Sequence, residues 1–264
     1  MTTLTLTHIK KLVELEAQVQ YDSFPPNGQV PYEVIDCTSS VLLSAPHGAK
    51  TFRQNDKEIW HEEDEYTAGM SLLIAEICGI SAIVMKWKCR DYDPNYTNRD
   101  DLPYKKEVGK LINEKGVHYV IDLHGAALFS EKLDSDQTID LGTRQQKADD
   151  PPSINLAHVN YLEGLLGDVG GQCEATNFVV RRNRFPASGP GTITTFASKH
   201  KIPNTDVNVE AIQIEMKPQV RVAQRFPAAT LYKSCGPFDA NPTCVLHMLQ
   251  SLANFVEYLK ERVN

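Results

Sequence analysis

Between residues 41 and 124, short apolar runs alternate with stretches of helical periodicity. VLLSA (41–45), SAIVMKW (81–87) and HYVIDLH (118–124) have the length and composition of buried strands. The segment between the first two has apolar residues at spacings of three and four, which predicts a helix over 64–78 that ends at Gly79. KKEVGKLINEKG (105–116) predicts a second helix. This alternation is typical of parallel strands joined by right-handed helical crossovers, so the sequence predicts an α/β fold.

The remaining elements extend the same fold on both sides of this core. Helices are predicted over 9–19 and 243–263, and strands over 177–182 and 211–216. We therefore expect one α/β domain with a central, mostly parallel or mixed sheet flanked by helices. In this domain, residues 1–40 form an N-terminal helix and lead-in, 41–220 the catalytic core, and 221–264 a C-terminal strand and helix.

Composition excludes several classes of protein. The chain of 264 residues is 41% hydrophobic, which allows one large buried core. A formal net charge of −7 argues against sequence-independent binding of nucleic acid, which requires clustered cations. No secretory signal and no run of 18 apolar residues is present, so we expect a cytoplasmic protein without a membrane partner. The six cysteines lack a C-x-x-C pair and are expected to be reduced.

Polar residues follow three of the predicted strands. His47 follows the first strand, Arg90, Asp93 and Asn95 follow the second, and Asp122 and His124 end the third. Because ligands of open α/β sheets bind at the carboxyl ends of the strands, these residues are candidates for a site. A single histidine at such a position is more often structural. Two of them, each followed by glycine, favour a shared metal ion.

A catalytic zinc site has three protein ligands of histidine and carboxylate type and one open position. We predict His47, His124 and an acid from HEEDEYT (61–67) as the ligands, with Asp64 preferred and Glu63 the alternative. These acids also suit the first turn of a helix without any metal. Asp122 is predicted to orient His124 through a hydrogen bond. A histidine and carboxylate set also suits iron, manganese or cobalt.

The strand AIQIEM carries the predicted general base. Alternation places Ile212 and Ile214 on one face and Gln213 and Glu215 on the other. Burying a glutamate on a strand is costly unless it faces a site, so Glu215 is the predicted base and Gln213 a predicted substrate contact. The alternative is an amphipathic strand with one solvated face.

Seven short blocks together resemble the N-formylglutamate amidohydrolase family, which is related to zinc carboxypeptidases and aspartoacylase-like enzymes. They are APHGA, DEYTAGMSLLIAEICG, CRDYDPN, VIDLHG, IDLGT, GPGTITTFAS and IQIEM, in that order between residues 41 and 220. The resemblance implies a zinc-dependent hydrolase of phosphorylase/hydrolase-like fold that cleaves the amide between a small acyl group and an acidic amino acid. It also implies that His47, His124 and an acid near Asp64 bind zinc, that Glu215 is catalytic, and that Arg90, Asp93 and Asn95 line the pocket.

Two features depart from the patterns of the family and its relatives. Lys50 stands where a His-x-x-Glu motif has its acid, and the Asn-Arg pair expected at Asn95 occurs later, at Asn98 and Arg99. Arg99 is therefore only one candidate for contacting a substrate carboxylate.

A second group of candidates lies in VVRRNRFPASGPGTITT (179–195). Either Arg181 or Arg182 is expected to face the site, and Arg182 is preferred. Thr192 and Thr194 of the following loop are further predicted substrate contacts. The alternative is a solvated basic loop.

The sequence thus favours a metallo-amidohydrolase that acts on a small acyl-amino-acid substrate. A zinc peptidase cutting γ-glutamyl or C-terminal bonds is one alternative, and a non-catalytic binding protein on the same scaffold is another. No G-x-S-x-G motif supports a serine nucleophile. The oligomeric state does not follow from the sequence.

Overall fold

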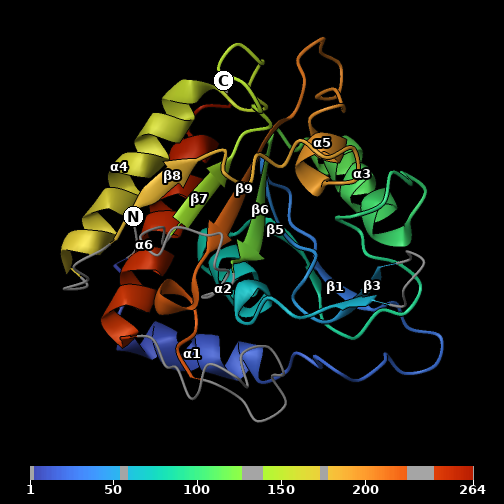
Figure 1. The fold of residues 1–264 in the computed structure, drawn as a ribbon, viewed down its shortest axis with the longest axis horizontal. Helices are drawn as coiled ribbons and strands as arrows, with labels where there is room; N and C mark the ends of the chain where they lie inside the picture. The colour runs from blue at the N-terminus through green and yellow to red at the C-terminus, as the bar shows by residue number, and fades with distance from the viewer. Residues whose placement is uncertain (1–2, 54–58, 127–138, 173–177, 225–240, 264) are drawn as a thin grey trace.

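A mixed β-sheet forms the centre of the structure (Figure 1), a computed structural model that describes residues 3–53, 59–126, 139–172, 178–224 and 241–263. Within these residues, seven strands form the central sheet in the order β1-β5-β2-β6-β9-β7-β8. They are β1 (Tyr32–Ile35), β2 (Val41–Ala45), β5 (Ser81–Met85), β6 (Tyr119–Gly125), β7 (Ile139–Gly142), β8 (Val180–Arg182) and β9 (Glu210–Met216). Strands β5, β2, β6 and β9 run parallel to one another, whereas β1 and β7 are antiparallel to their neighbours β5 and β9. The predicted mixed α/β sheet is confirmed.

Helices cover both faces of this sheet (Figure 1). They are α1 (Leu6–Glu16), α2 (Thr67–Cys78), α3 (Pro103–Lys115), α4 (Leu156–Gln172), α5 (Ile193–Ala197), the single turn η1 (Pro218–Val220) and α6 (Pro242–Lys260). Helices α2 and α3 each end at a glycine with positive φ, Gly79 and Gly116, a conformation that costs glycine little. A separate hairpin pairs β3 (Thr51–Arg53) with β4 (Ile59–His61).

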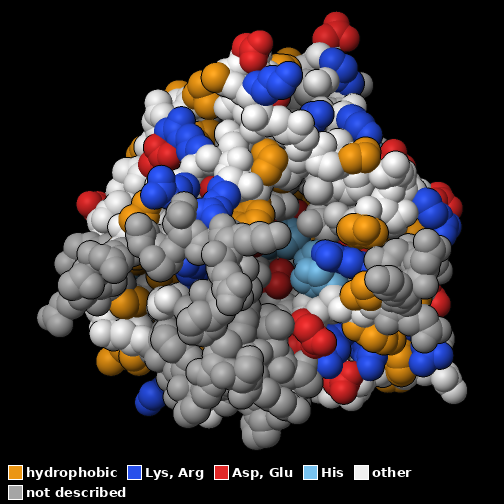
Figure 2. Space-filling view, viewed as in Figure 1, with side chains coloured by type: hydrophobic (Ala, Val, Ile, Leu, Met, Phe, Trp, Pro, Cys, Tyr) orange, Lys and Arg blue, Asp and Glu red, His pale blue; other side chains and the backbone are white. Residues whose placement is uncertain are grey.

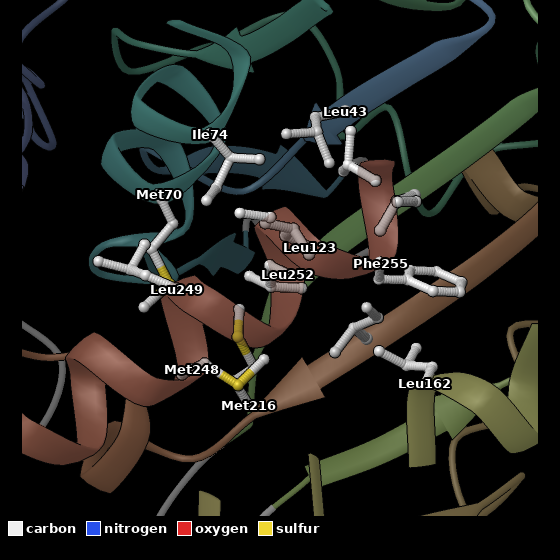
Figure 3. Close-up of a cluster of buried hydrophobic side chains, with 14 of the residues drawn as sticks. Leu43, Met70, Ile74, Leu123, Leu162, Met216, Met248, Leu249, Leu252 and Phe255 are labelled. Carbon is white, nitrogen blue, oxygen red and sulfur yellow. The ribbon is translucent and has the colours of Figure 1, made fainter. Parts of the chain in front are cut away.

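Two apolar clusters hold the layers together. On one face of the sheet, Leu43, Leu123 and Met216 pack with side chains of α2, α4 and α6, as Figure 3 shows. On the opposite face, apolar residues such as Leu42 and Val120 pack with side chains of α3 and α5. Each cluster removes a large apolar area from water, which favours the folded chain.

Strand alternation changes the character of the second face toward the carboxyl ends of β6 and β9. The residues that follow Val120 on this face are Asp122 and His124, whereas Ile121 and Leu123 belong to the first cluster. His124 is the register partner of Glu215 on β9. Polar side chains of adjacent parallel strands are therefore gathered at one edge of the sheet.

Several predicted boundaries need correction. The helix predicted from residue 64 begins at Thr67, and Tyr66 before it has a positive φ of 69°. The sequence did not predict β1, the β3–β4 hairpin, β7, α4, α5 or the turn η1. Most of the segment in which a C-terminal strand was expected, 225–240, lies outside the described residues.

Two further expectations concern the chain as a whole. Cys37, Cys78 and Cys89 are free thiols, but Cys244 is disulfide-bonded, so the expectation of six reduced cysteines is wrong. Spacing along a sequence does not reveal which cysteines meet in space. Among the described helices, none combines the length and apolar character that a membrane span requires.

Candidate metal and catalytic site

His47 and His124 lie together at the carboxyl edge of the sheet. His47 follows β2 and His124 is near the end of β6, and because these two strands are parallel neighbours, both residues reach the same edge. Their ring centroids are 4.9 Å apart. Figure 2 shows histidine side chains inside a hollow of the surface, with acidic and basic side chains beside them.

Asp64 lies between the two histidines. Its Oδ2 is 3.5 Å from Nδ1 of His47 and 3.3 Å from Nδ1 of His124. The Asp64 amide donates to the carbonyl of His47 at 2.7 Å, which fixes the acid just before α2. Burial raises the pKa of Asp64, but its contacts with His124 and His47 outweigh burial and hold the pKa well below its usual value. Glu63, the alternative acid, is also buried.

The far side of each imidazole is held by a second carboxylate. Nε2 of His47 is 2.8 Å from Oδ1 of Asp93, and Nε2 of His124 is 3.0 Å from Oδ2 of Asp122. Asn95 Nδ2 approaches His124 Nε2 at 3.3 Å. Carboxylates placed in this way orient the rings and leave both Nδ1 atoms directed at Asp64.

The carboxylates also change the protonation of the histidines. Burial lowers the pKa of His47, but Asp93 and Asp64 outweigh burial and raise the pKa to about 8. For His124 burial is likewise outweighed, chiefly by Asp122, and the pKa is raised well above its usual value. A divalent cation at the Nδ1 atoms would take the place of these protons, because a histidine ligand must be neutral.

Glu215 lies beside His124 on the adjacent strand β9. Burial raises the pKa of its carboxyl to about 7, against the lowering effect of His124. Gln213, two residues earlier on the same face, donates from Nε2 to Oε1 of Glu215 at 2.8 Å. Asp140, the register partner of Glu215 on β7, contributes to the raised pKa. The site therefore has a carboxyl that exchanges a proton near neutral pH.

His61 comes from the β3–β4 hairpin and stacks on His47 with ring centroids 3.9 Å apart. Its Nδ1 donates to the carbonyl of Glu62 at 2.7 Å, and burial together with the charge of His47 lowers its pKa to about 3. His61 is thus neutral, and its possible ligand atom lies within 4.8 Å of those of His47 and Asp64. The cluster offers either His124 or His61 as the third ligand.

The residues present fit a divalent ion. Nδ1 of His47 is buried and has no hydrogen-bond partner within the described part of the chain. It and Nδ1 of His124 point toward one carboxylate oxygen of Asp64 at distances longer than a hydrogen bond needs. Two imidazole nitrogens and a carboxylate oxygen are a usual donor set of catalytic zinc.

The predicted substrate contacts divide into residues at this site and residues elsewhere. Asp93, Asn95 and Gln213 lie against the histidines or Glu215. Asn95 Oδ1 accepts from the amide of Ile193, which brings the start of α5 to the site. Thr194 on this helix is buried.

Three predicted residues are engaged in other contacts. The Thr192 hydroxyl caps α5 and donates to the carbonyl of Ala187 at 2.8 Å. The exposed Arg90 packs over the ring of Phe24, with Cζ 5.2 Å from the ring centroid. Arg99 is exposed and pairs with Asp101 at 3.0 Å.

The structure places Arg182 away from the site. It pairs with Glu163 on α4, and its register partner on β7 is Leu141, which belongs to the cluster on the opposite face. Arg181 is the register partner of Asp140 on β7, so it lies on the face of the sheet that carries the site. The expectation that Arg182 faces the site is therefore wrong, because alternation along β8 places Arg181 on that face and Arg182 on the other.

The sequence analysis missed two arginines near the site. Arg53 of β3 donates from Nε to Oδ2 of Asp93 at 2.7 Å. Arg221 follows η1 and is fully buried, with Nε donating to the carbonyl of Met216 at 2.9 Å and Nη1 to the carbonyl of Glu65. Neither belongs to a recognisable motif. The two apolar residues that flank Arg221, Val220 and Val222, were the available signal for its burial.

Comparisons with known proteins support the fold. No family model matches the sequence, and no curated protein matches it either. Among solved structures, a gene product from Agrobacterium tumefaciens is similar with a TM-score of 0.51 and 12% identity, over 91% of this chain and 98% of that one. A bacteriophage poly-gamma-glutamate hydrolase gives 0.49 and 15%, over 89% and 92%. A metallo-carboxypeptidase from Burkholderia cenocepacia gives 0.41 and 9%, over 89% and 60%.

Similarity at these identities concerns the arrangement of the chain alone. Membership of the N-formylglutamate amidohydrolase family stays a prediction from the sequence blocks. The comparisons establish that this chain has an α/β fold also found in solved proteins.

Proposed function

We propose that this chain is a metal-dependent amidohydrolase. The observation that carries the proposal is the convergence of His47 and His124 on Oδ2 of Asp64, at 3.5 and 3.3 Å, while their opposite nitrogens are held by Asp93 and Asp122. An ordinary buried ion pair does not need two imidazoles oriented toward one oxygen. A divalent cation does, because it requires several donors at one point.

Zinc is the proposed ion, held by His47, Asp64 and His124. A bound divalent ion supplies a Lewis acid and lowers the pKa of water. Asp93 and Asp122 keep the two imidazoles in the orientation in which Nδ1 is available. His61 is the alternative third ligand, since it belongs to the same cluster.

Glu215 is the proposed proton carrier. Its carboxylate lies beside His124 on the adjacent strand, where it accepts a proton from the attacking water and can return it to the leaving amine. Gln213 holds Oε1 of Glu215 through a hydrogen bond at 2.8 Å, which leaves the other carboxylate oxygen for the reaction. Both roles depend on Glu215 lying beside His124, as the β6–β9 register ensures.

The proposed substrate is an N-acylated acidic amino acid or a related small amide. The sequence blocks support this class, because together they resemble enzymes that cleave such amides. Asn95 and Thr194 are proposed to complete the pocket, since both lie where α5 meets the carboxyl edge of the sheet.

Hydrolysis assays with a matched variant test the proposal. Zinc-loaded wild-type protein is incubated with N-formylglutamate, N-acetylglutamate and a γ-glutamyl dipeptide, and the released amine is measured. We expect turnover of at least one acylglutamate, and a loss of about 10²- to 10⁴-fold in Glu215→Gln with zinc retained. Turnover of the dipeptide alone would indicate a peptidase. Failure of wild type on all three, with zinc bound, would contradict the proposal and favour a binding protein.

A further inference from the structure

Beside the candidate metal site, Phe52 and Arg53 of β3 line an open cavity that Asp93 also lines. The register of the hairpin pairs Thr51 with His61 and Arg53 with Ile59, so these residues share one face while Phe52 and Trp60 share the other. The first face carries both His61, stacked on His47, and Arg53, bonded to Asp93. A single hairpin therefore positions a guanidinium next to the histidines.

Arg53 is fixed by two contacts. Its Nε donates to Oδ2 of Asp93 at 2.7 Å, and its Cζ lies 4.8 Å from the ring centroid of Tyr96. The other oxygen of Asp93 holds His47. One carboxylate thus separates the guanidinium from a proposed metal ligand.

Within the described part of the chain, most of the hydrogen-bonding capacity of Arg53 is unused. A guanidinium has five N–H donors, and the bond to Asp93 accounts for one. Within the described residues, no other hydrogen-bond acceptor contacts it, and its side chain is 29% exposed. Arg53 lines the cavity together with Tyr96, Thr97 and Arg99. A cation held in place with free donors at a cavity is suited to bind a planar anion.

The other charged groups that line the cavity are less suited than Arg53 to bind an anion. Arg99 is already paired with Asp101 and is exposed to solvent, so its charge is screened. The charge of Asp93 is shared between His47 and Arg53. Asp91 also lines the cavity but is exposed. Arg53 is the half-buried cation among them.

We infer that Arg53 binds the carboxylate of the substrate and selects amides that carry a second, anionic group. The inference rests on the proposed function and adds the residue that sets its specificity. Substrate bound in this way has its amide near His47 and its carboxylate on the hairpin. The selected class is acidic acyl-amino acids, and neutral amides of the same length are expected to bind weakly.

Binding of two probe acids to the zinc-loaded protein tests the inference without relying on turnover. Glutarate and pentanoate have the same number of carbons, but only glutarate has a second carboxylate. By calorimetry, wild type should bind glutarate about 10- to 100-fold more tightly than pentanoate, the range expected of a charge-assisted bidentate pair. Arg53→Gln should lose this preference, and Arg53→Lys should retain only part of it.

Two control variants make the result specific. Arg262 also packs over a tyrosine ring, with Cζ 3.8 Å from the centroid of Tyr258, so Arg262→Gln should keep the wild-type preference. Arg99→Gln should keep most of it. Three results would overturn the inference. The preference for glutarate over pentanoate could persist in Arg53→Gln, it could be lost in Arg99→Gln instead, or it could be missing in wild type. If Arg53→Gln fails to hold zinc, Arg53→Lys replaces it. A reduced preference for glutarate in Arg53→Lys then supports the inference, and an unchanged preference overturns it.

The outcome is separable from that of the proposed function. Protein that hydrolyses acylglutamates without preferring glutarate refutes the role of Arg53 alone. Protein that prefers glutarate through Arg53 and hydrolyses none of the amides refutes the enzymatic proposal alone.

Discussion

Arg221 connects the three segments that carry the candidate site, and its removal should weaken both the fold and metal binding. Its Nε and Nη1 donate to the carbonyls of Met216 and Glu65, which directly follow Glu215 and Asp64. A Cβ on Gly125, which follows His124, would lie 2.7 Å from Nη2 of Arg221. The guanidinium therefore contacts the residue after each of these three site residues.

The magnitude follows from the two hydrogen bonds. Each charge-assisted bond is worth about 1.5–3 kcal/mol, so Arg221→Met loses about 3–6 kcal/mol. Nη2 is buried and has no hydrogen-bond partner within the described residues, and removing it recovers about 1–3 kcal/mol. The free energy of unfolding should therefore fall by about 0–5 kcal/mol, with a midpoint of about 2.5 kcal/mol. Because the ligand segments lose a common anchor, zinc affinity should fall about 10- to 100-fold.

Urea unfolding and zinc competition with a chelator measure the two effects. Ser251→Ala on α6 is the control, since it removes a partly buried hydrogen bond of 3.0 Å to the carbonyl of Leu165 on α4 without contacting the site. It should lose stability and keep its zinc affinity. Gly125→Ala should resemble Arg221→Met, and the two changes should be strongly non-additive because they disturb one contact. Unchanged zinc affinity in Arg221→Met, or simple additivity with Gly125→Ala, would refute the reasoning.

Three further results are expected. Asp93→Asn should weaken zinc binding about 10- to 100-fold in the chelator assay, because the amide orients His47 less firmly; an unchanged affinity would argue against this role. Gly48→Ala should lower the free energy of unfolding by about 1–3 kcal/mol or more, since the new Cβ would lie 2.5 Å from the carbonyl oxygen of Met85, and wild-type urea stability would contradict the close approach. Burial raises the pKa of Glu16 from 4.5 to about 7, so the folded state holds a proton that the unfolded state releases between these values. As the pH rises from 4.5 to 7, the free energy of unfolding of wild type should therefore decrease relative to that of Glu16→Gln. Parallel pH profiles of the two proteins would show that Glu16 does not titrate in this range.

The hydrophobic pattern of the sequence predicted the central strands of the sheet better than the elements around them. Strands β2, β5, β6 and β9 are continuous apolar or alternating runs, and each was predicted within two residues of its observed ends. Strand β7 has four residues, and α4 contains Gly164 and Gly167, so neither has a strong local signal. The β3–β4 hairpin has mixed polarity and depends on contacts with the histidine cluster.

The candidate site shows the same division. His47 and His124 were predictable because each stands at the end of an apolar strand, and parallel neighbours share an edge. The position of Asp64 close to both rings could not be predicted, because it depends on the turn that precedes α2. Arg53 and Arg221 act through contacts with Asp93 and with main-chain carbonyls, which no sequence motif records. The face of Arg182 was missed because alternation allows only one of the adjacent Arg181 and Arg182 to face the site, and the local sequence does not indicate which one.

Metal stoichiometry of the purified protein tests the proposed site without any assumption about substrate. Zinc is titrated into chelator-treated wild type, His47→Ala and His124→Ala, and bound metal is measured after gel filtration. One zinc per wild-type chain and none in either variant is the predicted result. A folded wild type that binds no divalent ion, or variants that keep the wild-type stoichiometry and affinity, would show that the two imidazoles and Asp64 form only a buried ion pair.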